Sequence, residues 1–285
     1  MSDVTLDAFI DSLTPPALDR TTVSQRRAGL EAAVTANTSC SSFFESGSWS
    51  HGTSIRGHSD VDYMAFIPAY ARPGLPSTAL SNLKDAIVRS HCSVTDVRIS
   101  SPAVKVSFYQ PPDFEIAPAY YNREQRGISV FQIPGPGNQW VESIPSGHNA
   151  YVNAVNDRLG KKLKPLVRLV KSWKYEQEVP VSSFYLEMRT ASYADGESSI
   201  VYDIDLRAVF RQLVIGEMRD MNDPLGIVSR IPATSSEVNR LNALRAARQA
   251  QGHLEEADAA KTAGDASRYW RNMAAVFGYD YPYPS

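Results

Sequence analysis

The sequence predicts an α+β fold, in which an N-terminal part built around a mixed β-sheet precedes a C-terminal part made of helices. Within residues 41–119, short runs rich in β-branched and aromatic residues alternate with turn signals, as strands do. Beyond about residue 151, apolar residues recur every three or four positions, which is the period of amphipathic helices. A chain of 285 residues can hold one large domain or two smaller ones. We therefore expect two domains, residues 1–160 and 161–285, with a cleft between them.

Two helices are expected before the sheet. In residues 3–13 the apolar side chains recur at helical spacing, and a pair of prolines then ends the pattern. A second helix is expected to run to about Asn37, with Asp19 or Thr21 as its N-cap.

The sheet is expected to be built from five short runs, with one helix, TALSNLKDAIVRSH, packed on it. A turn at Pro111, Pro112 and Asp113 joins the last two runs, so these runs are expected to form a hairpin. Residues 121–150 are rich in Gly, Pro, Asn and Ser, which predicts an irregular connector. The expected strands are FFES, DYMAFIP, VTDVRI, AVKVSFY and FEIAPA.

Helical segments are expected to fill the rest of the chain. The first has a wide apolar stripe that includes Trp173. The last is a long pair rich in Ala, Arg and Glu, expected to break near Gly264. The expected helices are LKPLVRLVKSWKYEQ, SSFYLEMRTASYA, DIDLRAVFRQLVIGEMRDM and this pair.

The composition excludes several classes of protein. A hydrophobic share of 43% and a charged share of 21% are ordinary for a soluble globule, and no run is long enough for a membrane-spanning helix. The acidic N-terminus is not a secretory signal. Cys40 and Cys92 form neither a disulfide framework nor a zinc site, so we expect buried apolar side chains in a reducing cytoplasm. A net charge of −2 argues against a protein built mainly to hold polynucleotide, although small anionic ligands still fit.

The most informative segment runs from Gly47 to Asp62. Alternate residues of a strand share a face, so Asp60 and Asp62 are expected to project together and to repel one another unless a cation lies between them. A divalent ion with oxygen ligands is the usual solution. The Gly47-Ser48 turn can bring backbone N–H groups close to a phosphate. Together these features predict a site for Mg²⁺ and a nucleoside triphosphate.

A third carboxylate is expected, because phosphoryl transfer with two metal ions needs one more ligand. Glu115 is the candidate, since a carboxylate flanked by Phe114 and Ile116 on a strand faces away from both. Asp113 competes for the role but lies in the turn. A D-x-D pair alone is common, and the ordered set of Gly-Ser, Asp-x-Asp and a carboxylate on a later strand is what makes the pattern specific. The histidines of the loop, at positions 51 and 58, match no zinc pattern.

This ordered set resembles that of the nucleotidyltransferase superfamily with a DNA polymerase β-like fold. More narrowly, the chain resembles the bacterial CD-NTases, which are similar to cyclic GMP-AMP synthase and oligoadenylate synthase. The resemblance covers nearly the whole chain. It is carried by SGSWSHGTSIRGHSDVDYM, FEIAPA, IPGPGNQWVESIP, LVRLVKSWK, SSFYLE, Trp270 and VFGYDYP.

The resemblance implies a metal triad of Asp60, Asp62 and Glu115 that holds two Mg²⁺ or Mn²⁺ ions. Many relatives have Asp at the third position, and Glu is an accepted variant. It also implies that Gly47 and Ser48 hold the donor triphosphate in an active-site cleft.

Further roles follow from the same resemblance. Lys171 would neutralise the β- and γ-phosphates, although a snorkelling surface lysine is the plainer reading of such a residue. Ser183 would bond a phosphate, and Phe184 would stack on the donor base where many relatives have Tyr. Asn156 is either a reader of the acceptor base or a helix cap.

Two loop residues complete the set of candidates. Thr53 and Arg56 match the family's pattern between Gly-Ser and Asp-x-Asp. Arg56 either touches phosphate or only braces the loop.

The implied function is synthesis of a cyclic oligonucleotide, a cyclic dinucleotide first of all. Nucleoside triphosphates serve as donor and acceptor, and pyrophosphate is released. The resemblance further implies a monomer without membrane or stable polynucleotide partners, whose product activates a separate effector in CBASS anti-phage defence. The alternatives are a nucleotidyltransferase that tails RNA or modifies a small molecule or protein, and a catalytically silent nucleotide-binding module. The balance of 29 basic and 31 acidic residues disfavours RNA tailing.

Overall fold

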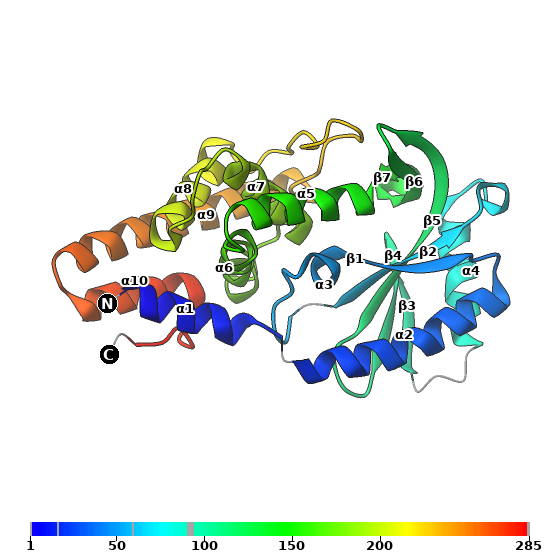
Figure 1. Cartoon of the computed structure of the whole chain (residues 1–285), viewed down its shortest axis with the longest axis horizontal. Coiled ribbons are helices and arrows are strands. Elements are labelled where there is room, and N and C mark those ends of the chain that lie inside the picture. The colour runs from blue at the N-terminus through cyan, green and yellow to red at the C-terminus, as the bar shows by residue number, and fades with distance from the viewer. Residues whose placement is uncertain (1, 16, 59, 90–93, 284–285) are drawn as a thin grey trace. The chain divides into compact units, whose positions relative to one another are not determined.

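The computed structural model describes residues 2–15, 17–58, 60–89 and 94–283 (Figure 1). The chain divides into two compact units, which we name the sheet unit and the helical unit. The sheet unit comprises Pro15–Tyr151 and Leu225–Ser229, and the helical unit comprises Met1–Thr14, Val152–Pro224 and Arg230–Ser285. Each unit is therefore built from segments that are not contiguous in the sequence.

A seven-stranded mixed sheet organises the sheet unit. Its main order is β1-β2-β5-β4-β3, and β6 and β7 extend it from β5. The β2–β5 pair is parallel and the other pairs are antiparallel, including the predicted β4–β5 hairpin. The strands are β1 (Ser42–Ser46), β2 (Val61–Ile67), β3 (Val94–Ser100), β4 (Ala103–Phe108), β5 (Phe114–Gln125), β6 (Ile128–Gly135) and β7 (Gln139–Ser143).

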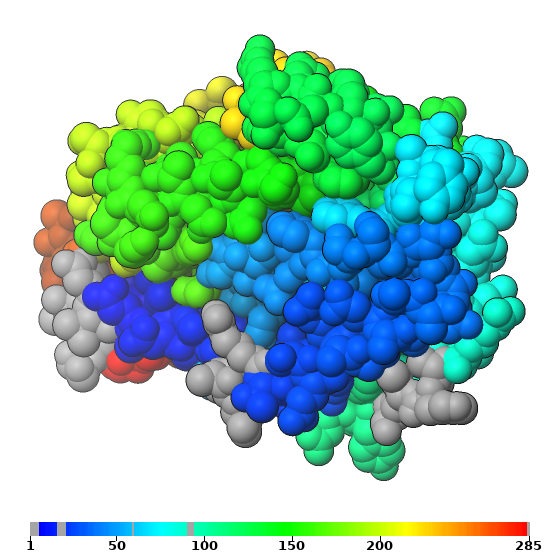
Figure 2. All heavy atoms as spheres, turned by 45° about the vertical axis from the view of Figure 1, so that its right-hand side comes forward, coloured from blue at the N-terminus to red at the C-terminus, as the bar shows by residue number. Residues whose placement is uncertain are grey.

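One face of this sheet is covered by α2 (Ala17–Asn37) and α4 (Pro76–Val88), which contribute Leu30 and Leu83 to the same core as Val61, Tyr63 and other strand residues. The outer face of α2 forms part of the surface seen in Figure 2. Along β2 every second side chain is fully buried, because successive side chains of a strand point to opposite faces. The side chains between them, Asp62 included, therefore lie on the face away from this core.

Residues 121–150 form regular structure, so the predicted irregular connector is wrong. Strand β5 continues to Gln125, and Arg126 and Gly127, with φ of 53° and 73°, make the tight turn into β6. Positive φ at both central residues matches the twist of a two-residue hairpin. Gly135 allows close packing of β6 on β7, because a Cβ there would lie 2.4 Å from Val141 Cγ1. The glycines that suggested a loop serve strand pairing instead.

The remaining described elements of the sheet unit are three short helices and the first half of α5. The first of them, α3, opens directly after β1. They are α3 (Gly47–His51), η1 (Ala69–Ala71), η2 (Pro136–Asn138) and α5 (Pro145–Arg158), which runs on into the helical unit.

The helical unit is packed around large side chains from several helices. Trp173 meets Phe210 edge to face at 4.9 Å between ring centroids, and Phe9 contacts the rings of Phe277 and Tyr281. Its helices are α1 (Ser2–Leu13), α6 (Leu163–Glu176), α7 (Ser183–Asp195), α8 (Tyr202–Ile215), α9 (Glu237–Thr262) and α10 (Ala266–Phe277). These aromatic contacts bring the first helix of the chain onto the last.

The α+β class is confirmed, and so are most predicted elements. The break between α9 and α10 falls at Gly264, whose φ is 72°. Helix α8 ends earlier than expected, because Glu217 and Met218 take positive φ just after it. Cys40 is buried as expected, and Cys92 lies outside the described residues. Within the described part of the chain, no helix is both long and apolar enough to cross a bilayer.

Candidate functional site

A row of polar residues crosses five strands of the sheet unit. Ser46 pairs with Asp62, Asp62 with Glu115, Glu115 with Lys105, and Lys105 with Arg98. Paired residues of neighbouring strands share one face of a sheet. The register therefore brings two of the predicted metal ligands, Asp62 and Glu115, into direct neighbourhood.

Lys105 joins this group to Asp60. Its Nζ donates to Asp60 Oδ2 at 2.6 Å and lies 3.5 Å from Asp113 Oδ2. Sequence reasoning missed Lys105, although a signal was present. A lysine within the apolar run AVKVSF, on the strand that the hairpin turn places beside Glu115, is expected to face the carboxylates.

Asp113 has a structural role in the hairpin turn. Its carboxylate accepts hydrogen bonds from Ser107 Oγ at 2.9 Å and from the Phe108 N–H at 3.4 Å. These bonds hold the turn between β4 and β5 closed. Glu115, its rival for the third ligand, occupies the register position beside Asp62.

The carboxylates named in this group, Asp60, Asp62, Asp113 and Glu115, outnumber its two named cations, Lys105 and Arg98. Burial raises the pKa of Glu115, and the charge of Asp60 adds to the rise, while Lys105 and Arg98 oppose it. Burial by itself lowers the pKa of Lys105, but the hydrogen bond that Lys105 donates to Asp60 and the charges of three carboxylates bring that pKa above its usual value. A cation added beside Glu115 would favour its charged form and relieve the repulsion from Asp60.

A divalent metal fits this group by its chemistry and by the backbone register, since carboxylate oxygens are the ligands that Mg²⁺ and Mn²⁺ prefer. The side chains, however, are arranged around Lys105. Among the residues that the structure describes, no three His, Cys, Asp or Glu side chains lie together as a metal-holding group. In this arrangement Asp60 is paired with Lys105 and not with a metal ion.

Gly47 lies against the carboxylate of Asp62. Its φ is +62°, and a Cβ at this position would lie 2.0 Å from Asp62 Oδ2. Only glycine combines this backbone with such a close approach. The predicted Gly-Ser turn is the first turn of the five-residue helix α3, with Ser48 as its second residue.

The loop after α3 is braced from within. The Thr53 N–H donates to the Ser48 carbonyl at 2.8 Å, and the Thr53 side chain is fully buried. Arg56 is exposed in the following turn, as is His58, whereas His51 is buried in α3. Of the two loop candidates, Arg56 alone presents its side chain to solvent.

A second charged group lies in the helical unit, where α6 packs on α7. Lys171 is 1% exposed and its Nζ lies 3.9 Å from Glu187 Oε2. A snorkelling surface lysine is therefore excluded for this residue. One turn along the same helix face, Lys174 Nζ donates to Ser183 Oγ at 2.6 Å.

Lys174 is the second residue that sequence reasoning missed. Burial, together with the nearby charge of Lys171, lowers the pKa of Lys174 to about 8. Ser183 also bonds Tyr175 Oη at 3.2 Å, and the neighbouring Phe184 is one-third exposed. A half-buried ammonium beside a hydroxyl and an exposed ring is a suitable setting for a phosphorylated, aromatic ligand.

Asn156 serves as a cap. It lies in α5, is 2% exposed, and its Oδ1 accepts from the Lys164 N–H at 3.2 Å. Lys164 belongs to the first turn of α6, whose N–H groups have no partner within the helix. Of the two readings left open by the sequence, the structure shows the cap.

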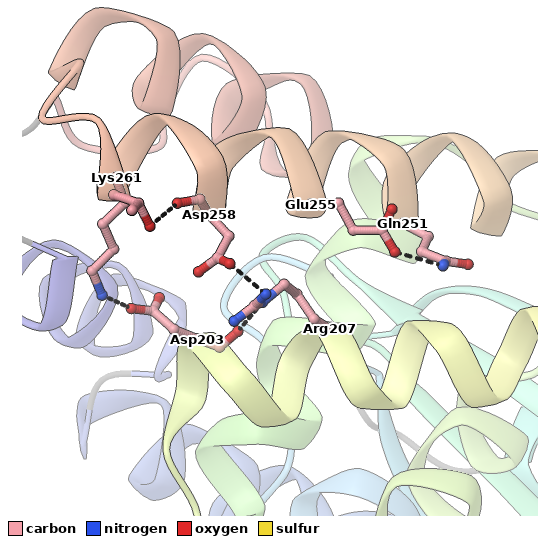
Figure 3. A network of polar contacts seen from close by, with 7 residues as sticks. Asp203, Arg207, Gln251, Glu255, Asp258 and Lys261 are labelled. Carbon is pink, nitrogen blue, oxygen red and sulfur yellow. Dashed lines mark hydrogen bonds and ion pairs between the residues drawn. The ribbon is translucent and has the colours of Figure 1, made fainter.

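A separate pocket in the helical unit is lined by charged side chains that form ion pairs with one another. It is lined in part by Asp203, Arg207, Asp258 and Lys261. Arg207 contacts Asp258 at 2.6 Å, and Lys261 contacts Asp203 (Figure 3). This network ties α8 to α9 and leaves no net charge to attract a ligand.

Comparison with protein families identifies the chain. Residues 2–156, more than half of the sequence, match the model of the Second Messenger Oligonucleotide or Dinucleotide Synthetase domain, SMODS. The chain belongs to this family. The predicted resemblance to CD-NTases is thereby confirmed, and the family and fold are those of nucleotidyltransferases. A comparison with curated proteins found no match.

Solved structures share the fold over most or all of the chain. CdnC of E. coli MS115-1, solved with ATP, has a TM-score of 0.77 at 21% identity, and the match covers 99% of each chain. CdnG of Bradyrhizobium diazoefficiens, solved with GTP, has a TM-score of 0.75 at 14% identity, covering 98% of this chain and 95% of CdnG. DncV of Vibrio cholerae, a cyclic AMP-GMP synthase, has a TM-score of 0.66 at 15% identity, covering 85% of this chain and 70% of DncV. The protein thus has the polymerase β-like fold of these enzymes.

Proposed function

We propose that this protein is a cyclic oligonucleotide synthase that joins nucleoside triphosphates, in the first instance into a cyclic dinucleotide. The observation that carries the proposal is the register of β2 and β5, which aligns Asp62 with Glu115 beside Asp60 in a member of the SMODS family. Acidic side chains alone do not define an enzyme. The proposal combines two observations: the position of these carboxylates on neighbouring strands, and the membership of the chain in a family of nucleotidyltransferases.

The proposed reaction has two similar steps. In the first, a ribose hydroxyl of the acceptor attacks the α-phosphorus of the donor, a new O–P bond forms, and the bond to the β-phosphate breaks with release of pyrophosphate. In the second, the linear product closes by the same chemistry and releases a second pyrophosphate. Two Mg²⁺ or Mn²⁺ ions held by Asp60, Asp62 and Glu115 would polarise the attacking hydroxyl and stabilise the charge of the leaving group.

The chain's own residues supply binding and orientation. Gly47 lets the start of α3 lie against Asp62, so that phosphates bound by Gly47 and Ser48 are near the carboxylates. In the helical unit, Lys174 and Ser183 present an ammonium and a hydroxyl that suit phosphate oxygens.

Two further residues of the helical unit, Lys171 and Phe184, lie beside Lys174 and Ser183. The charge of Lys171 is balanced by the buried carboxylate of Glu187, so its part is to support Lys174 and not to contact phosphate. Phe184 offers an exposed ring for stacking on a base. Arg56, exposed in the loop after α3, is a further candidate for phosphate contact.

The biological role follows from the family. The protein would act in the cytoplasm, and its cyclic product would activate a separate effector protein in CBASS anti-phage defence. One fold neighbour, CdnC of E. coli MS115-1, has been solved in a complex with HORMA-deltaN. Because this proposed role depends on a cyclic product, formation of that product is tested first.

The test is product analysis with all four ribonucleoside triphosphates and Mg²⁺ or Mn²⁺, each nucleotide labelled in turn. After phosphatase treatment, chromatography and mass determination should reveal a resistant cyclic species from the wild-type protein and none from Asp62→Asn. Long or linear products would support RNA tailing or another transfer reaction instead. Nucleotide binding without any pyrophosphate release would support a silent binding module.

A further inference from the structure

Lys105 occupies an unusual place for a lysine. It lies in the middle of β4 between Val104 and Val106, which are both fully buried in the core of the sheet unit. Because side chains alternate along a strand, Lys105 faces the opposite side of the sheet, where the carboxylates lie. Its ammonium group is only partly exposed, with 19% of the side chain accessible.

Carboxylates from three chain segments surround this one ammonium. Asp60 precedes β2 and accepts its hydrogen bond, Asp113 lies in the β4–β5 turn at 3.5 Å, and Glu115 is its register partner on β5. Asp62 stands beside Glu115 in the next strand, and Arg98 lies on the other side of Lys105. Lys105 is thus the nearest cation to Asp60 among these groups.

We propose that Lys105 is a built-in counter-ion that holds Asp60 in the metal-free protein and competes with the metal ion for this carboxylate. The proposal rests on the proposed function, because it requires that Asp60 is a metal ligand. Lys105 is a positioning residue in this account. It keeps like charges apart until a metal arrives, and it does not touch the reacting atoms.

The competition follows from the geometry. At 2.6 Å the Lys105 ammonium is in contact with Asp60 Oδ2, so an ion coordinated by the same oxygen cannot share its position. An ion of charge +2 carries more charge than the ammonium and coordinates several oxygens at once. The metal is therefore expected to win at millimolar concentration, but its observed affinity is reduced by the free energy of the ion pair it must break.

The test is a titration of the nucleotide-free protein with Mn²⁺ alone, followed by calorimetry, together with thermal unfolding in EDTA and in saturating Mn²⁺. Lys105→Met removes the charge and keeps the length of the side chain. Lys105→Arg keeps the charge. Lys261→Met is the matched control, since Lys261 also pairs with an aspartate, Asp203, but far along the chain in the helical unit (Figure 3).

We expect Lys105→Met to bind Mn²⁺ about tenfold more tightly than wild type. In EDTA its melting temperature should fall by about 2–4 °C, because the carboxylates lose their counter-ion. In saturating Mn²⁺ the difference in melting temperature should shrink, because the metal then neutralises the same groups. Lys105→Arg should bind Mn²⁺ like wild type, and Lys261→Met should change neither Mn²⁺ affinity nor the effect of Mn²⁺ on stability.

Unchanged or weaker Mn²⁺ binding by Lys105→Met would overturn the inference while leaving the metal site in place. Failure of the proposed function looks different. In that case wild type and Lys105→Met would both fail to bind Mn²⁺, and the inference would fall with the metal site. Equal tightening by Lys105→Arg and Lys105→Met would also count against the counter-ion, since charge would then not be the cause.

Discussion

The two units carry charged groups of opposite sign. In the sheet unit, Asp60, Asp62 and Glu115 are accompanied by one close lysine, and the pKa of Glu115 is raised. In the helical unit, two lysines are accompanied by Glu187, and the pKa of Lys174 is lowered. Among the residues named, carboxylates therefore outnumber lysines in the first group, and lysines outnumber carboxylates in the second. By charge, the first group is suited to a cation and the second to an anion.

The internal ion pairs of the two groups also differ in burial. Lys171 and Glu187 are both almost completely inaccessible, so neither can exchange its partner for a ligand from solvent without disturbing the core. Lys105 and Asp60 are 19% and 31% exposed at the side chain, which permits exchange. The buried pair is therefore expected to act on stability, whereas the partly exposed pair is open to exchange with an ion from solvent.

The largest expected effect is on catalysis by the sheet unit. Replacing Asp60 and Asp62 together by Asn should reduce cyclic product formation by at least about a thousandfold, because the ligands of the metal lose their charge. Circular dichroism should remain that of wild type, since Asn has nearly the size of Asp and the repulsion relieved at the start of β2 offsets the lost ion pair between Asp60 and Lys105. Product at the wild-type rate would show that these residues do not hold the metal.

The buried pair of the helical unit should govern stability. Lys171→Met should lower the free energy of unfolding by about 3 kcal/mol, because Glu187 loses its ammonium partner in a buried position. Urea denaturation measures this loss. A double variant with Glu187→Leu should recover part of the loss, and a loss of less than about 1 kcal/mol in the single variant would contradict the burial argument.

Gly47 and Gly57 both have positive φ, and they differ in the space around an added Cβ. Gly47→Ala should cost about 1–2 kcal/mol of stability through its positive φ and should also reduce product formation, because its Cβ collides with the Asp62 carboxylate. Gly57→Ala is the matched control, since Gly57 has φ of +77° but no atom within 4 Å of an added Cβ. Urea denaturation and product yield are measured for both. Equal loss of product in the two variants would leave backbone strain as the whole explanation.

The smallest effect concerns the protonation of Lys174. With a pKa of about 8 in the folded protein, its ammonium is present below pH 8 and lost above it. Affinity for a nucleoside triphosphate in EDTA should therefore fall as the pH rises through 8. Lys174→Ala should lower the affinity at pH 7 by about tenfold and remove this step. Calorimetry at pH 7 and pH 9 tests both, and an unaltered pH profile in the variant would exclude Lys174 from phosphate binding.

The same group affects stability in the opposite direction. Between about pH 8 and 10.5 the unfolded chain binds a proton at Lys174 that the folded protein has already released. Stability from this group therefore rises with pH across that window. Ligand binding and folding thus respond to pH with opposite signs at this one residue.

Local patterns in the sequence were sufficient for much of the fold and for part of the site. The alternation in β2 and β5 placed Asp62 and Glu115 on the polar face, and the turn at Asp113 correctly joined β4 to β5. Helix α6 was evident from its apolar stripe, and Gly264 marked the end of α9. In each case the information lies within about ten residues of chain.

The rest depends on contacts between segments that are distant in sequence. Lys105 meets Asp60 only through the order of β2, β5 and β4, and Lys174 meets Ser183 only through the packing of α6 on α7. For Asn156 the sequence favoured a helix cap but left base recognition open, and the bond that its Oδ1 accepts from the Lys164 N–H lies across two helices. Residues 121–150 were misjudged because glycine and proline are common both in loops and in tightly paired, twisted strands.

The measurement that tests the account most directly is the ratio of pyrophosphate released to phosphatase-resistant product formed, followed in the same reaction with Mg²⁺ or Mn²⁺. Closure of a cyclic dinucleotide predicts two pyrophosphates for each phosphatase-resistant molecule. The variant with Asp60→Asn and Asp62→Asn should form neither pyrophosphate nor resistant product. Pyrophosphate release accompanied only by phosphatase-sensitive linear products would contradict the proposed ring closure.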